Sequence, residues 1–157
     1  MSALAPLIDA YLAGIQTLRT SVAGMTHEQL LARPVPGKWS TLEVVCHLAD
    51  FEPIMADRMK RVIALEKPSL LGADENCFAA ALAYHDRDIE EELTIIEQTR
   101  RQLARILRTL PAEALGRVGI HNERGPRTLE QLLTSNTNHV THHVKFIHDK
   151  RKALGLS

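Results

Sequence analysis

One amphipathic segment covers residues 128–154 and reads TLEQLLTSNTNHVTHHVKFIHDKRKAL. It begins with a Thr-x-x-Gln capping box at Thr128, in which two side chains satisfy backbone amides at a helix start, and Gly155 follows its basic end. The segment therefore predicts a long helix. Four residues of helix rise about 6 Å and turn about 40° from a full rotation, so His139 and His143 project from one face and can bind one ion.

The apolar residues of this segment predict which side of the helix faces the core. They are Leu129, Leu133, Val140, Val144, Ile147 and Leu154. At about 100° per residue, His143 lies about 40° from the inward direction and His139 about 80°. Asn136 points inward beside the pair and is a candidate supporting residue for a ligand. His142, at about 140°, is expected to face solvent.

Three other long segments repeat apolar residues at three- and four-residue spacing: residues 3–22, 41–65 and 86–110. A Ser-x-x-Glu capping box at Ser40 opens the second of them. Shorter helical pieces are expected at 26–31, 74–84 and 111–115, with a loop at 67–73 and a loop or small hairpin at 116–127. We predict an all-α four-helix bundle with short additional helices in its connections, as a single domain over residues 1–157.

The segment 86–110 has acidic residues at its start and basic residues toward its end. They are Asp86, Asp88, Glu90, Glu91 and Glu92, then Arg100, Arg101, Arg105 and Arg108. This order complements the helix dipole, because negative charge is favoured at a helix start and positive charge at its end. It predicts a solvated, well-terminated helix and not an acidic binding site.

A third histidine, His47, lies on the predicted second helix, about 75° from the centre of its apolar stripe. It is the best remaining candidate for a third ligand. Three neutral imidazoles with an open position are the arrangement of catalytic zinc, and nickel also suits imidazole. Asp50, one turn further on, could accept a hydrogen bond from a ligand's second ring nitrogen. Cys46 points about 100° away from His47 and is not expected to bind the same ion.

The remaining histidines are expected to have other roles. His27, His85 and His148 are predicted at the surface, whereas His121, in the loop before the last helix, is left open. Trp39, just before the second helix, is expected to be a packing anchor. The histidines of the predicted bundle can also be read without any metal, as core residues that are merely packed.

Composition excludes several classes of protein. Nineteen basic and nineteen acidic residues give a net charge of zero, which argues against nucleic acid as the main partner. No apolar stretch approaches the roughly 18 residues that span a bilayer, and two cysteines outside any CxxC pair suit a reducing cytoplasm. A chain of 157 residues can bury a core without a structural metal, so a metal here would be free to serve chemistry.

Two motifs together resemble a known family. Residues 37–50 read GKWSTLEVVCHLAD, and residues 139–143 read HVTHH. Their order and separation resemble the DinB/YfiT-like superfamily of candidate metal-dependent enzymes. The resemblance implies that His47, His139 and His143 bind one divalent metal ion, often zinc or nickel, in a four-helix bundle that is commonly dimeric. Members include metal-dependent hydrolases, and transferases and isomerases that use a low-molecular-weight thiol such as bacillithiol or mycothiol.

The sequence hypothesis is a cytoplasmic metalloenzyme that acts on a small molecule by activating water or a thiol; no general base can be assigned. The alternative is a non-catalytic helical stress protein that binds a metal or small ligand. A homodimer is expected, through the first helix or the segment 89–110.

Overall fold

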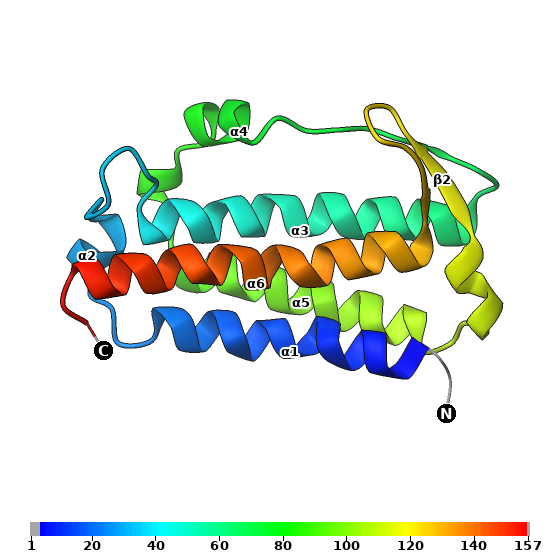
Figure 1. Ribbon diagram of the computed structural model, residues 1–157, viewed down its shortest axis with the longest axis horizontal. Coiled ribbons are helices and arrows are strands. Elements are labelled where there is room, and N and C mark those ends of the chain that lie inside the picture. The colour runs from blue at the N-terminus through cyan, green and yellow to red at the C-terminus, as the bar shows by residue number, and fades with distance from the viewer. Residues whose placement is uncertain (1–3, 157) are drawn as a thin grey trace.

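The computed structural model describes residues 4–156 and has four long helices lying side by side (Figure 1). These are α1 (Leu4–Val22), α3 (Thr41–Ala64), α5 (Ile89–Leu107) and α6 (Leu129–Ala153). The predicted all-α four-helix bundle is confirmed. The expected start of the first helix, Ala3, lies outside the described residues.

Short elements occupy the connections. Four are helical: α2 (His27–Leu31), α4 (Glu75–Ala81) and the 3-10 turns η1 (Tyr84–Asp86) and η2 (Ala112–Gly116). Strands β1 (Ser69–Leu70), β2 (Val118–His121) and β3 (Gly125–Thr128) form a small sheet in that order. The hairpin expected as one of two readings at 116–127 is present, as antiparallel β2 and β3. The prediction of a loop over 67–73 was wrong for Ser69 and Leu70, which form β1. This strand pairs in parallel with β2, which is distant in the sequence, so no local pattern could indicate it.

Capping side chains define where the helices begin. Ser40 and Thr128 each accept a hydrogen bond from a backbone amide three residues on, and Glu43 and Gln131 bond back to the cap amides. Both predicted capping boxes are therefore confirmed. The same motif at Thr26 opens α2. These bonds satisfy amides that have no partner inside a helix, so the three starts are set locally.

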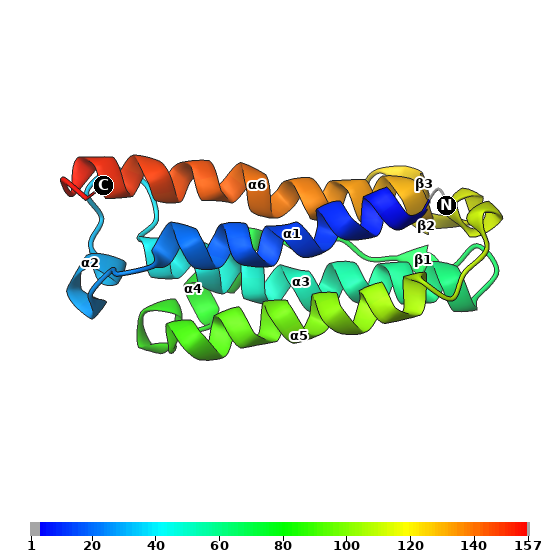
Figure 2. The same cartoon turned by 90° about the horizontal axis from the view of Figure 1, so that it is seen from below.

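The order of the helices requires one long crossover. Figures 1 and 2 show α3 and α5 running in the same direction, while α1 and α6 run in the opposite one. Since α3 has 24 residues, the chain must return about 36 Å before α5 can begin. Residues 65–88 make that return along the outside of the bundle and carry β1 and α4 across its surface (Figure 1).

The bundle core has two large apolar halves with a polar layer between them, and a smaller third cluster contains Leu42, Cys46 and Tyr84. One half contains Ile8, Met59, Leu103 and Leu133, and the other contains Leu18, Leu48, Ile96 and Val140, among other residues. The polar layer takes one side chain from each long helix: Tyr11, Glu52, Arg100 and Asn136, all almost fully buried.

Within residues 4–156, no helix is long and apolar enough to cross a membrane.

The Glu52 carboxylate connects all four helices. Its Oε1 accepts from the Tyr11 hydroxyl at 2.6 Å and from Asn136 Nδ2 at 2.9 Å. Its Oε2 accepts from Nε and Nη2 of Arg100, both at 3.0 Å. Arg100 also donates to the backbone carbonyls of Tyr11 and Asn136. Gly14 makes room for it, because a Cβ there would lie 2.5 Å from Arg100 Nη1.

The expectation of a fully solvated helix over 86–110 was wrong for two residues. Arg100 is 0% exposed and Glu92 is 3% exposed. Each is paired with a residue of opposite charge: Arg100 with the buried Glu52, and Glu92 with the half-buried Arg87. Arg101, the neighbour of Arg100, behaves as predicted and forms an exposed pair with Glu97.

Replacing Arg100 with Gln should lower the free energy of unfolding by about 3–5 kcal/mol, because the buried Glu52 carboxylate loses its counter-charge. The matched control is Arg101→Gln, which makes the same change one residue away and should cost about 1 kcal/mol or less. Urea denaturation of both variants measures the difference. Equal losses in the two variants would contradict a structural role for the buried pair.

Candidate metal centre

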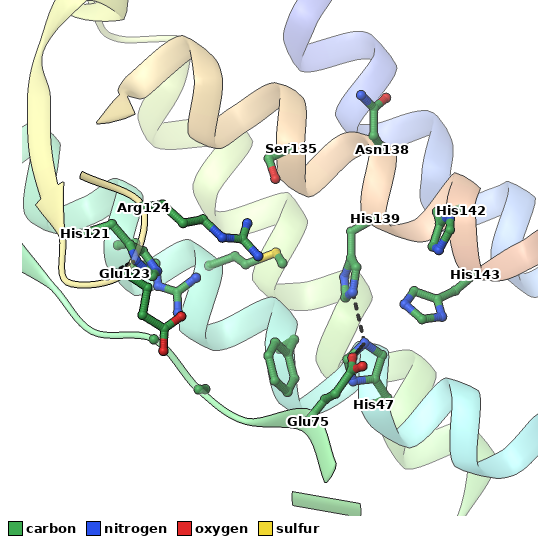
Figure 3. Close-up of a pocket in the computed structure, with 15 residues that line it drawn as sticks. His47, Glu75, His121, Glu123, Arg124, Ser135, Asn138, His139, His142 and His143 are labelled. Carbon is green, nitrogen blue, oxygen red and sulfur yellow. Dashed lines mark hydrogen bonds and ion pairs between the residues drawn. The ribbon is translucent and has the colours of Figure 1, made fainter. Parts of the chain in front are cut away.

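Three histidines from two helices, α3 and α6, come together. His47 lies in the second turn of α3, and His139 and His143 lie on α6, with the side chains converging as Figure 3 shows. One ring nitrogen from each lies within 4.8 Å of the others. Nε2 of His47 and Nε2 of His139 are 2.9 Å apart. Ligands of one tetrahedral zinc lie about 3.3 Å apart, so the cluster has the scale of a metal site.

Burial keeps these imidazoles neutral. Burial lowers the pKa of His47 to about 4, against a smaller raising effect of Asp50. Burial, together with the neighbouring histidines, lowers the pKa of both His139 and His143 to about 3. At neutral pH each ring therefore has a free lone pair, which is the form that binds a metal. Three neutral imidazoles, that of His47 buried and those of His139 and His143 half-buried, fit a divalent metal ion.

The two predicted supporting residues have other partners. Both Asp50 oxygens accept from Arg87, at 2.8 and 3.0 Å, and Asn136 Nδ2 donates to Glu52. Nδ1 of each of the three histidines is buried and has no hydrogen-bond partner within residues 4–156. The predicted hydrogen bond from a ring nitrogen to Asp50 is thus not made here, because Asp50 accepts from Arg87 instead.

Aromatic side chains surround the histidines. The ring centroids of Trp39 and Phe51 lie 5.3 and 4.6 Å from that of His47. Trp39 also packs against the apolar core, so its predicted role as a packing anchor is confirmed. His142 is exposed, as predicted, and its ring centroid lies 5.2 Å from that of His143.

A cleft of about 530 Å³ opens from the histidines along the groove between α3 and α6. The crossover covers one side of it, through Gly72, Ala73 and Glu75, and the β2–β3 turn covers its far end (Figure 3). The volume lies in the usual range for small-molecule sites, about 300–1,000 Å³. The cleft therefore joins the histidines to a space that can hold a substrate.

Glu75, which the sequence reasoning missed, lies beside the histidines. It is the first residue of α4, where Asp74 caps the helix, and its Oε2 lies 3.6 Å from Nε2 of His47. Because His47 is neutral at pH 7, this contact is not an ion pair. The carboxylate is 52% exposed and borders the cleft. No local pattern could have found it, since it reaches the site only through the crossover.

The other histidines are divided between the surface and the cleft. His27, His85 and His148 are exposed, as predicted. His121, which the sequence left open, is buried on β2 and lines the cleft. Its Nδ1 accepts a hydrogen bond from the backbone amide of Glu123, at 3.2 Å.

Comparison with known proteins agrees with this geometry. The chain is 28% identical over 130 residues to a candidate metal-dependent hydrolase of Oceanobacillus iheyensis. The matched residues make up 83% of this chain and 75% of the relative. It is 27% identical over 141 residues to the candidate metal-dependent hydrolase YfiT of Bacillus subtilis, covering 89% and 79%.

The solved structure of Bacillus subtilis YfiT has the same fold. It is described as a probable metal-dependent hydrolase with an unusual four-helix bundle topology. It superimposes with a TM-score of 0.89 at 25% identity, over 97% of this chain and 87% of the other. The family model for the DinB superfamily matches residues 10–147, which include all three clustered histidines. This chain belongs to the DinB superfamily.

Proposed function

We propose that this protein is a metal-dependent hydrolase in which His47, His139 and His143 hold one divalent ion, zinc or nickel. The observation that carries the proposal is the cluster of three imidazole nitrogens within 4.8 Å, at one end of a cleft. The names of the relatives support the same class of reaction. A cleft of about 530 Å³ suits a small-molecule substrate.

Residues of the chain provide the remaining chemistry. His47, His139 and His143 would hold the ion, which when bound would supply a Lewis acid that lowers the pKa of water to about 7. Glu75 accepts the proton of the attacking water, since its carboxylate lies beside the histidines and is open to the cleft. Water oxygen adds to the carbonyl carbon, the bond to the leaving group breaks, and Glu75 returns the proton to the leaving group.

A low-molecular-weight thiol is the second nucleophile that this proposal includes. The same bound ion would favour the deprotonated form of a thiol, and Glu75 would accept the thiol proton in the same position. The sulfur would then bond to an electrophilic carbon of the second substrate as the bond to its leaving group breaks, and the leaving group would take the proton from Glu75. A metal-loaded protein that turns over neither esters, amides nor thiol–electrophile pairs would support the binding-protein alternative instead.

We also propose a cellular location and an oligomeric state. We place the protein in the cytoplasm, as a homodimer that contacts through α1 or α5, in keeping with the family resemblance. Light scattering of the purified protein measures the oligomeric state.

Metal content tests the proposed ligands. Protein supplemented with zinc or nickel and then dialysed should keep about one ion per chain, as a single three-histidine site would. His47→Ala and the double variant His139→Ala/His143→Ala should lose it, because each removes at least one of three ligands. His142→Ala is the matched control, since it removes an exposed neighbouring imidazole, and it should keep the ion. Elemental analysis makes the measurement, and stoichiometric metal in the double variant would refute the site.

Glu75→Gln should lower the kcat for a p-nitrophenyl ester by about 100-fold or more, because an amide cannot accept the proton. Its metal content should equal that of the wild type. Glu91→Gln, which makes the same charge change at an exposed position of α5, is the control and should retain full activity. A kcat of Glu75→Gln within about threefold of the wild-type value would contradict the proposed role of Glu75, since loss of a general base lowers the rate far more.

A further inference from the structure

Two arginines line the end of the cleft that is opposite the histidines. Arg58 follows His47 by 11 residues on α3. That spacing puts both residues on one helix face, about 16 Å apart along the axis. Arg124 comes from the turn between β2 and β3, and Figure 3 shows its guanidinium reaching into the cleft from that turn. The fold therefore brings two cations from distant parts of the chain to one place.

These guanidiniums keep donors available for a ligand. Arg58 donates through Nε and Nη2 to the backbone carbonyl of Leu71, at 3.1 and 2.6 Å, which anchors the side chain and leaves Nη1 without a partner within residues 4–156. In the same described range, Arg124 has neither a hydrogen bond nor an ion pair with a protein group. One arginine is thus held in position, and the other is free to close on a ligand.

The electrostatics at this end of the cleft favour an anion. Arg58 is partly buried, and its pKa is lowered first by that burial and then by the charge of Arg124. The pKa of His121 is lowered by burial and then by the same two arginines. Glu123, which also lies in the cleft lining, and Asp57 oppose the charge at Arg58, whereas Arg127 adds positive charge near His121. Arg58 and Arg124 thus repel each other across a space in which a negative charge would reduce that repulsion.

We propose that Arg58 and Arg124 bind a carboxylate of the substrate, so that the substrate's reacting group lies at the three histidines. This inference rests on the proposed function for the histidine end of the cleft. Planar guanidiniums match the two oxygens of a carboxylate, and Glu123 disfavours a doubly charged phosphate. The cleft then selects an elongated molecule with a reactive bond at one end and a negative charge at the other.

Isothermal titration of the metal-loaded protein tests this assignment with ω-mercaptocarboxylates of increasing chain length. Each is compared with a mercaptoalcohol and a mercaptoalkylphosphonate of the same length. At one chain length the carboxylate should bind about tenfold or more tighter than the alcohol, which is the size expected for charge-assisted hydrogen bonds. The preference should weaken as salt is raised, because the arginines are accessible to solvent.

Substitutions test which side chains cause the preference for the carboxylate. Arg124→Gln, which removes no bond within the described protein, and Arg58→Gln should each bring the carboxylate and alcohol affinities to within about threefold, as expected when a charged donor is lost. Arg61→Gln is the control, because it makes the same charge change one turn along α3, where Arg61 is exposed and pairs with Asp57. It should preserve the preference.

Three results would overturn the proposal: equal affinities for carboxylate and alcohol at every length, a preference that persists in both Arg58→Gln and Arg124→Gln, or tighter binding of the phosphonate. Metal content and binding of the mercaptoalcohols report on the histidine end separately. Simple alkyl carboxylates and matched alcohols need no metal, and ligand-observed NMR compares them on the same variants. The carboxylate preference is thereby measured even if the metal proposal fails.

Discussion

The buried bond between Glu52 and Arg100 is the interaction on which the arrangement of the bundle depends. A carboxylate and a guanidinium in an apolar core are stable only when each satisfies the other, and here Tyr11 and Asn136 complete the set. Glu52 is five residues from His47, and Asn136 is three residues from His139. The polar layer therefore sets the distance between α3 and α6 next to the point where the histidines meet.

The crossover over residues 65–88 gives the bundle its site. Parallel neighbours such as α3 and α5 cannot be joined by a short turn, so the chain must travel back along the outside. That return places Glu75 beside His47 and closes one wall of the cleft. Arg58 holds the same segment through the Leu71 carbonyl. The crossover that this topology requires therefore brings Glu75 to the histidines of α3 and α6 and covers one side of the cleft.

The cleft is electrostatically asymmetric. At one end burial keeps three imidazoles neutral and able to bind a cation; at the other, two arginines repel each other and attract an anion. A metal ion would accept the imidazole lone pairs at one end, and a carboxylate would reduce the repulsion between the arginines at the other. The polar residues of the cleft are therefore consistent with one elongated substrate, held at its charged end and transformed at the other.

The sequence by itself determined the four long helices, the two capping boxes that start α3 and α6, and the side of its own helix from which each of His47, His139 and His143 projects. Each of these follows from helical period or local hydrogen bonding, which depend on neighbouring residues alone. Only the tertiary structure decided that Arg100 is buried, that Asp50 pairs with Arg87, that β1 pairs with β2, and that Glu75 lies beside the histidines. Helical period gives the direction of a side chain from its own helix, but its partner depends on which distant element packs there.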